Sequence, residues 1–528
     1  MAKMAFTGPG YFWVTSSAME VEFKFCIPPE RLADVQAAVR RGRFAAVQMQ
    51  AHYFDTTDGA LAAHGIAFRL RLEGEHWVQT VKASGDGPLD RYEHNTARGP
   101  AKPGKAPQPL PELHAGTVAG ARLLQALHAA KGPLTETYGT GIDRITRTIT
   151  RQGAVVELAL DTGRVVAHRG TSQQAEARIC ELELELKAGP VGGLAALARQ
   201  WATRHGLYLS TVSKAERGER LLAAPGSRPA HQARPQRITH QLPAGPALQR
   251  AVVAHCLQHI LSPASEIAEG SNDAEQVHQL RIGIRRLRTA LRELAPLAQG
   301  RFDPAWERPL VQVFEQLGHL RDRYQVMQRI EADLRAAGAP PVLAQEDEDT
   351  GSAAAMHIVR AAAFQGALVG LMAFATQGLE ATASEPAGLD AKATRRLLQK
   401  RLRALHDQIR KGAQDFAVRT PQAQHRLRKR LKRLRYLTEF VAPALSAKSA
   451  DFLSSLQPAL SALGRLNDER VAAQLYRDIA VTRQAQAWFG AGWLAARQAL
   501  AVTACEHALS RIGPAPRLRK TRKHQGGH

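Results

Sequence analysis

The sequence predicts an α+β protein of several domains, with a β-rich N-terminal half and an all-α C-terminal half. Three observations lead to this prediction: alternating strand-like runs in residues 1–220, helical periodicity in residues 221–528, and an internal repeat within the second half. The chain has 528 residues, of which 44% are hydrophobic and 23% charged. It is therefore long enough for two or three domains and too apolar for a fully disordered protein.

Apolar and polar residues alternate with a period of two in several runs of the first half, the pattern of a half-buried β-strand. These runs are EVEFKF (20–25), FRLRLE (68–73), WVQTVK (77–82), VVELALD (155–161) and ELELELK (181–187). Residues 29–41 and 191–205 are instead typical of helices. Because residues i, i+2 and i+4 lie on the same face of a strand, each run has one charged and one apolar face.

The charged faces are acidic at both ends of this half and contain arginines in between. The simplest interpretation of one such strand is a sheet with a solvated charged face. Several strands closed into a barrel would place carboxylates beside arginines and lysines. Carboxylates hold hard divalent cations, and arginine and lysine clamp phosphate oxygens. This combination is what the hydrolysis of a phosphoanhydride needs.

The second half contains a duplication. VHQLRIGIRRLR (277–288) aligns with QHRLRKRLKRLR (424–435) at an offset of 147, and LGHLRD (317–322) aligns with LGRLND (463–468) at an offset of 146. Two motifs that keep nearly the same spacing indicate a repeated helical unit.

The first repeated motif predicts a basic helix face. Residues three or four apart share a face, and here they are His278, Arg281, Arg285 and Arg288, repeated as His425, Arg428, Lys432 and Arg435. Like charges at this spacing repel, so an anion is expected on this face, with an ordinary solvated basic face as the alternative. The formal net charge of +23, of which +18 lies in residues 221–528, also indicates a polyanionic partner.

Two other functions of this face are disfavoured. Nucleic-acid binding has little support, because the basic helices contain few aromatic residues and no helix-turn-helix or RNA-recognition motif is evident. Metal binding by His278 or His425 is not expected, because neither has a histidine or acidic residue four positions later.

The remaining sequence features point to a reducing, aqueous compartment. The four cysteines are far apart and form no CxxC pair, so a disulfide framework is not expected. No signal peptide is predicted, and the most apolar stretch, residues 361–375, is too short for a membrane span. We expect it to be a buried helix, and we expect the protein to be cytoplasmic.

The N-terminal motif MEVEFKF resembles the Glu-x-Glu-x-Lys motif of the CYTH family, the triphosphate tunnel metalloenzymes. The resemblance covers about residues 18–220 and continues in order through YFDT, FRLRLE, TVK, RYE, ELALDTG, ICELELELK and SKAERG. It is closest to the inorganic triphosphatase branch and implies an eight-stranded antiparallel β-barrel that forms a tunnel. The chain departs from the family pattern at His94 and Arg147, where aromatic residues are usual.

The resemblance also implies roles for individual residues. The metal ligands for Mg²⁺ or Mn²⁺ would be Glu20, Glu22, Glu181 and Glu183, which form the catalytic set together with Lys24 and Asp161. Asp161 would bind the metal or position water. The triphosphate would be bound by Lys24, Arg69, Arg71, Lys82, Arg91, Arg144 and Lys214.

Residues 246–512 resemble the CHAD domain, a helical domain often fused behind CYTH. The resemblance implies two four-helix bundles related by a pseudo-twofold axis, with a basic groove that binds long-chain inorganic polyphosphate. The implied contacts are His278, Arg281, Arg285, Arg288, His425, Arg428, Lys432 and Arg435. Residues 221–245 would be a linker and residues 513–528 a solvated basic tail.

The function expected from both halves is metal-dependent hydrolysis of tripolyphosphate to pyrophosphate and phosphate, with recruitment to polyphosphate. Two alternatives stay open. The protein could bind polyphosphate and have only weak or vestigial tunnel activity, or it could hydrolyse an organic triphosphate such as thiamine triphosphate or ATP.

Overall fold

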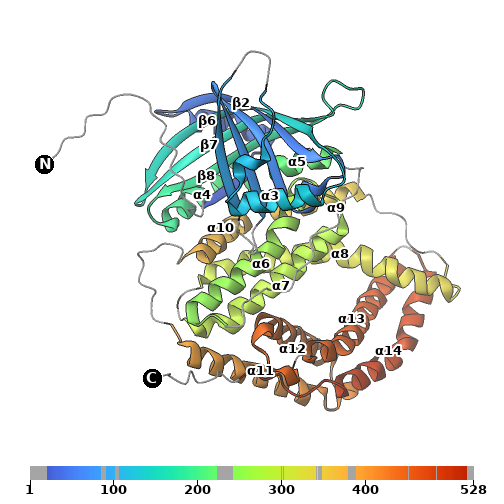
Figure 1. Cartoon of the computed structure of the whole chain (residues 1–528). Helices are drawn as coiled ribbons and strands as arrows, with labels where there is room; N and C mark the ends of the chain where they lie inside the picture. Colours follow the sequence, from blue (N-terminus) through green and yellow to red (C-terminus); the bar gives the residue numbers. More distant parts are fainter. Residues whose placement is uncertain are drawn as a thin grey trace, which may run out of the picture.

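A computed structural model of the chain describes residues 21–84, 91–101, 106–222, 242–298, 300, 302–340, 342, 348–377, 388–449, 451–482 and 484–519. An antiparallel sheet forms the N-terminal part and is followed by a helical region (Figure 1). The prediction of a β-rich half and an all-α half is therefore confirmed.

The described sheet has the strand order β5-β4-β3-β2-β6-β7-β8-β1-β9. Its strands are β1 (Glu22–Cys26), β2 (Ala45–Thr56), β3 (Ile66–Glu73), β4 (His76–Ser84), β5 (Arg91–Pro100), β6 (Leu134–Arg151), β7 (Ala154–Ala167), β8 (Ala175–Ala188) and β9 (Tyr208–Leu209). The five runs that alternate in the sequence lie in β1, β3, β4, β7 and β8. Alternation therefore identified these strands correctly.

The expected closed barrel of eight strands is not confirmed. The described sheet has nine strands, and its two edge strands, β5 and β9, do not pair with each other within the described residues. The additional strand, β9, contains only two residues and pairs with Phe25 and Cys26 of β1. A strand this short has no periodicity by which the sequence could have predicted it.

Helices cover both faces of the sheet. The helices of this half are α1 (Leu32–Val39), α2 (Ala60–Ala63), α3 (Val118–Ala129), α4 (Val191–His205) and α5 (Lys214–Leu222). Leu158 and Leu182 face the apolar side of α4 in one core. On the opposite face of the sheet, α5 packs against β6, β7 and β8, with Ala215 next to Ile179.

The helical region contains α6 (Gly245–Ala268), α7 (Ala274–Leu294), α8 (Glu307–Ala336), α9 (Glu348–Arg360), α10 (Ala362–Thr376), α11 (Ala391–Ala413), α12 (Pro421–Phe440), α13 (Phe452–Thr482) and α14 (Ala487–Ser510). The first repeated motif lies on α7 and α12, and the second lies on α8 and α13. Helix α7 packs between α6 and α8, just as α12 packs between α11 and α13, and α7 also contacts α12. This equivalent packing is what a duplicated unit predicts.

Local signals in the sequence explain where several helices begin. Thr420 caps α12 by accepting a hydrogen bond from the backbone N–H of Ala423, and Pro421 takes the first helical position. The apolar stretch 361–375 forms α10, most of whose apolar side chains are buried, as expected. No single described helix is both long enough and apolar enough to span a membrane. Residues 352–360 and 362–376 meet both criteria only when they are taken together, and a 54° bend separates them.

The sequence predicted a solvated basic tail, and its start is only partly solvated: Arg517 and Arg519 are exposed, but Leu518 between them is partly buried. Leu518 forms a β-bridge with Leu445, and the N–H of Arg519 donates to the carbonyl of Ala444 at 2.8 Å. The apolar side chain of Leu518 packs on the core and explains this contact. Residues 520–528 lie outside the described residues. All four cysteines are free, in agreement with the sequence.

The two halves share one apolar core, which runs from the sheet and α4 into the helical region. Helix α10 packs against α4, and both α6 and α10 contact β9. The link between the halves therefore includes buried side chains and does not depend on the connecting segment alone.

Gly218 lets α5 approach the sheet closely, because an added Cβ would lie 2.2 Å from Cδ2 of Tyr138. We expect Gly218→Ala to lower the free energy of unfolding by about 1–3 kcal/mol through overpacking. The control is Gly192→Ala in α4, where nothing lies within 4 Å of the added Cβ. This control should be neutral or gain up to about 1 kcal/mol in helix propensity. Guanidinium unfolding followed by circular dichroism measures both, and equal stability of the two variants would contradict the close contact of α5.

Candidate functional site

Strand register brings the predicted site residues of β1, β8, β7 and β6 onto one face of the sheet. Lys24 lies opposite Glu183, Glu181 lies opposite Asp161, and Asp161 lies opposite Arg144. Directly opposed residues on neighbouring antiparallel strands have side chains on the same face. Residues up to 159 positions apart therefore form one charged cluster.

Three carboxylates in this cluster could hold a cation. One oxygen each of Asp161, Glu181 and Glu183 lie within 4.8 Å of one another. Asp161 and Glu181 are fully buried, and Oε2 of Glu181 has no hydrogen-bond partner among the described residues. Buried carboxylate oxygens are hard ligands that suit Mg²⁺ or Mn²⁺, so the chemistry of the cluster fits the predicted metal.

Two cations neutralise the carboxylates. Nζ of Lys214 lies 2.8 Å from Oδ2 of Asp161 and 3.1 Å from Oε1 of Glu183, and it also contacts Glu181. Arg144 binds both oxygens of Asp161, at 2.6 and 2.7 Å, and donates to Glu183 at 2.8 Å. Because Lys214 touches all three carboxylates, a metal ion held by them would compete with its ammonium group.

These ion pairs control the charge states in the cluster. Burial alone would raise the pKa of Glu183, but Lys214 and Arg144 outweigh it and hold this pKa well below its usual range. Burial alone would lower the pKa of Lys214, but Glu181, Glu183 and Asp161 raise it well above the ordinary lysine value. Glu183 and Lys214 are therefore both charged at neutral pH.

A basic wall on β3 lies next to this cluster. Arg69 donates to the hydroxyl of Tyr53 at 3.1 Å, and the Tyr53 ring stacks on Tyr138 with 4.8 Å between the ring centroids. Arg71 pairs with Glu73. The pKa of Arg71 falls below its ordinary value because of burial and the nearby charges of Arg69 and Arg144. Such crowding of positive charge is typical of a site that binds an anion.

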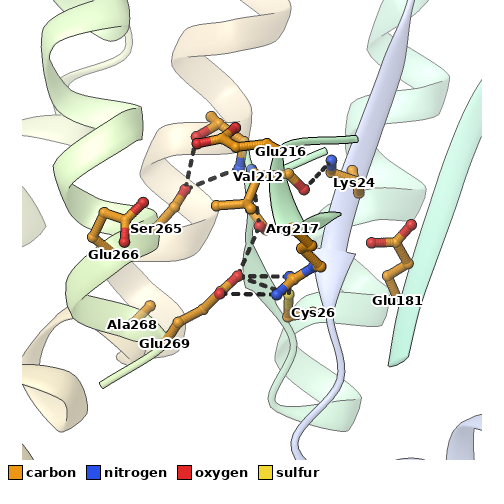
Figure 2. A network of polar contacts seen from close by, with 12 residues as sticks. Lys24, Cys26, Glu181, Val212, Glu216, Arg217, Ser265, Glu266, Ala268 and Glu269 are labelled. Atoms are coloured by element: carbon orange, nitrogen blue, oxygen red, sulfur yellow. Dashed lines mark hydrogen bonds and ion pairs between the residues drawn. The ribbon is translucent and has the colours of Figure 1, made fainter. Parts of the chain in front are cut away.

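The other predicted tunnel residues are distributed along the same sheet. Lys24 donates to the carbonyl of Val212 at 2.6 Å (Figure 2), and Lys82 pairs with Glu93 at 2.6 Å. Glu22 is exposed at the start of β1, outside the three-carboxylate cluster. Arg91 lies at the start of β5, opposite Ser84 in the register. Glu20 lies outside the described residues.

The two departures from the family pattern have structural partners. His94 faces His114, with 2.8 Å between their Nδ1 atoms, and burial together with His94 lowers the pKa of His114 to about 4. Arg147 donates to the carbonyl of Ala38 at 3.0 Å and so connects β6 to α1. Neither residue contacts the three carboxylates.

A second cationic cluster lies between α7 and α12. The guanidinium carbons of Arg281 and Arg285 lie 5.0 and 5.2 Å from the centre of the Phe314 ring on α8. Burial and the charges of Arg285 and Arg428 lower the pKa of Lys432 to about 6. These four basic residues come from both copies of the repeat, and we call them the basic groove after the groove that the CHAD resemblance implies: Arg281, Arg285, Arg428 and Lys432.

The other predicted groove residues have polar neighbours. His425 lies 3.2 Å from Asn467. Arg288 pairs with Glu307 at 3.6 Å, and Arg435 pairs with Glu439 at 2.8 Å. His278 lies on α7, one turn before Arg281.

Sequence analysis missed several residues of both clusters. Asn467 and Asp468 lie in the second repeated motif and act on His425 and Lys432, so that motif was a usable signal. Tyr53 also belongs to the charged face of the sheet. The pair Arg217–Glu269, at 2.8 Å, joins the halves across 52 positions and left no signal in the sequence.

Replacement of Glu183 should alter the dependence of stability on pH. Because the folded-state pKa of Glu183 is depressed, its stabilising contribution is complete above the ordinary value of about 4.3 and is lost as pH falls towards the folded-state pKa. We expect Glu183→Gln to lower the thermal midpoint most at pH 7 and least at pH 3, measured in a chelator.

The matched control for this experiment is Glu176→Gln. Glu176 lies on β8, the same strand as Glu183, and forms an exposed ion pair with Arg164 of β7. This control should have little effect at either pH, because exposed ion pairs contribute little. If the difference in thermal midpoint between wild type and Glu183→Gln stayed constant from pH 7 to pH 3, the depressed pKa of Glu183 would be contradicted.

Known proteins resemble both halves. Residues 18–218 match the CYTH domain family, and residues 251–477 match the CHAD domain family. An inorganic triphosphatase of Haemophilus influenzae is 26% identical over 208 residues, which are 38% of this chain and 54% of that protein. The chain therefore spans about half the length of this curated relative.

Two solved structures are similar as well. The CHAD domain of the plant Ricinus communis is 24% identical and is covered completely, over 56% of this chain, with a TM-score of 0.46. A putative adenylyl cyclase from Hippeastrum, described as having a dominant triphosphatase activity, is 19% identical. The match covers 37% of this chain and 93% of that one, with a TM-score of 0.27. By its two family matches, the chain contains a CYTH domain at residues 18–218 and a CHAD domain at residues 251–477.

Proposed function

We propose that the CYTH domain is a metal-dependent triphosphatase that hydrolyses tripolyphosphate to pyrophosphate and phosphate. The observation that carries this proposal is the buried group Asp161, Glu181 and Glu183 beside the basic wall of Arg69 and Arg71 on the same sheet face. The inorganic triphosphatase activity of the Haemophilus relative supports the same substrate.

Each side of the site has a separate role in this reaction. Arg69, Arg71 and Lys82 bind phosphate oxygens, and Lys24 and Lys214 extend this positive surface towards the carboxylates. Arg144 holds Asp161 and Glu183 in place through its hydrogen bonds. Water attacks the terminal phosphorus, the P–O bond to the leaving pyrophosphate breaks, and a carboxylate of the cluster accepts the proton of the water.

Asp161, Glu181 and Glu183 would hold Mg²⁺ or Mn²⁺, which would neutralise phosphate charge and make bound water more acidic. Glu20 and Glu22 remain predicted ligands from the first strand. The ammonium group of Lys214 contacts the same carboxylates and has to make room for the ion. Lys214 is then available to bind the phosphate chain.

For the CHAD domain we propose binding of inorganic polyphosphate in the basic groove. The supporting observation is that four cations from two helices lie close together, with the pKa of Lys432 lowered to about 6. A polyanion would relieve this repulsion, because phosphate oxygens stabilise the protonated form of Lys432. Polyphosphate granules are the location that this proposal implies.

Removal of Glu183 should abolish the tunnel reaction without affecting the groove. We expect Glu183→Ala to lower metal-dependent phosphate release from tripolyphosphate at least 100-fold, because a charged ligand of the cluster is lost. Binding of long-chain polyphosphate should stay within twofold of wild type. The control Glu176→Ala, on the same strand but exposed, should keep full activity. Comparable turnover by Glu183→Ala and wild type would refute the metal assignment. Release of phosphate from ATP but not from tripolyphosphate would show that the substrate is an organic triphosphate.

Removal of two groove cations should weaken polyphosphate binding and its dependence on salt. For Arg285→Ala with Lys432→Ala, we expect at least a 10-fold loss of affinity and a shallower slope of log K against log salt, because fewer counterions are released. The control is Arg199→Ala with Arg204→Ala, which removes two exposed arginines from α4. Titration of labelled polyphosphate at several salt concentrations measures both. An unchanged slope in the groove variant would place the binding surface elsewhere.

A further inference from the structure

We propose that the CHAD domain positions two lysines of the tunnel, Lys24 and Lys214, through the segment 210–217, and that Glu269 is the positioning residue. This inference rests on the proposed function of the tunnel, in which both lysines bind triphosphate. We call residues 210–217 the strap, because one side of the segment contacts the charged face of the sheet and the other side contacts α6 (Figure 2).

The strap holds both lysines on the tunnel side. The N–H of Ser210 donates to the backbone carbonyl of Lys24 at 3.0 Å, and Nζ of Lys24 donates to the carbonyl of Val212 at 2.6 Å. Lys214 belongs to the strap itself and pairs with Asp161 and Glu183. A displacement of the strap would therefore move both lysines relative to the carboxylates.

Glu269, the residue that follows α6, is the centre of the contacts on the other side. Its carboxylate accepts from Arg217 at 2.8 and 3.1 Å, and from the hydroxyl of Ser210 at 3.1 Å. Oγ of Ser210 also accepts from the N–H of Val212 at 3.2 Å. One carboxylate of the CHAD half thus holds both ends of the strap and, through Ser210, the residue that binds Lys24.

Further contacts hold the strap from the helical side. Oγ of Ser265, one turn earlier on α6, accepts from the N–H of Thr211 at 3.0 Å. Immediately before the strap, the N–H of Leu209 donates to the side chain of Gln365 on α10 at 2.8 Å. Arg360 lies over the Tyr208 ring, 4.2 Å from its centre. Side chains of α6 therefore hold the strap itself, and side chains of α9 and α10 hold the two residues before it.

Because the ion pair between Arg217 and Glu269 is partly buried, we expect replacement of either residue to destabilise the strap. The side chains of Arg217 and Glu269 are 15% and 18% exposed, so the pair is shielded from most of the solvent. Removal of one charge leaves the other partly buried without its partner, and such a change costs more than the loss of an exposed pair.

The same interface offers a matched control. Glu266, one turn before Glu269, pairs with Arg220 of α5. Arg220 lies beyond the strap and also pairs with Glu216 within it, at 3.0 Å, so it keeps a carboxylate partner when Glu266 is replaced. Neither Glu266 nor Arg220 contacts Ser210 or Val212 in the hydrogen bonds described above. Glu266→Gln therefore weakens the domain interface without releasing the strap, whereas Glu269→Gln releases it.

The first experiment compares steady-state hydrolysis of tripolyphosphate by the full-length wild type, Glu269→Gln and Glu266→Gln. We expect Glu269→Gln to raise KM for tripolyphosphate at least 5-fold and Glu266→Gln to stay within twofold of wild type. The thermal midpoints of the two variants should be similar. Equal changes of KM in both variants would mean general loosening of the interface and would overturn the positioning role.

The second experiment does not depend on turnover. Hydrogen–deuterium exchange of peptides that span the strap should become at least 5-fold faster in Glu269→Gln, while Glu266→Gln should match wild type there. Equal exchange in all three proteins would overturn the inference even if the enzyme is active. If the wild type does not hydrolyse tripolyphosphate, the proposed function fails, and the exchange result still decides whether Glu269 holds the strap.

Discussion

The buried ion-pair network around Asp161 is the constraint on which the arrangement of the charged sheet face depends. Asp161 and Glu181 are completely buried, so each needs a positive partner to offset the loss of hydration. Arg144 and Lys214 are these partners, and they come from β6 and from the first residue of α5. The network can form only if α5 lies against the sheet, and the small Gly218 allows this approach.

The helical domain contains both arginines held in ion pairs and a cluster of crowded basic residues. Arg286 and Arg433 pair with Glu439 and Glu293 and so connect α7 with α12. Two residues of the basic groove, Arg285 and Lys432, lie one position before these paired arginines, and burial together with the charges of Arg285 and Arg428 lowers the pKa of Lys432 to about 6. Paired cations stabilise the interface, whereas the crowded ones cost stability that a bound anion would restore.

The sequence predicted what depends on local periodicity and little of what depends on contacts between distant segments. Alternation identified the main strands and the charged face with Glu181 and Glu183, and the repeat identified α7 and α12. Periodicity could not predict that Arg286 pairs with a carboxylate whereas its neighbour Arg285 belongs to the basic groove. The partner of Arg286, Glu439, lies 153 positions away in the sequence. The two residues of β9, the docked Leu518 and the Arg217–Glu269 pair were missed for the same reason.

The strap connects these two electrostatic systems. Its Lys214 neutralises the carboxylates of the tunnel, while its Arg217 neutralises Glu269 next to α6, and α6 packs against α7, which carries half of the basic groove. The charges on this face of the sheet are therefore arranged with help from the domain for which we propose the second anion site. If groove occupancy shifts α6, the effect must be reciprocal, because a free energy that couples two sites acts equally in both directions. Triphosphate in the tunnel would then change the affinity of the groove by the same factor.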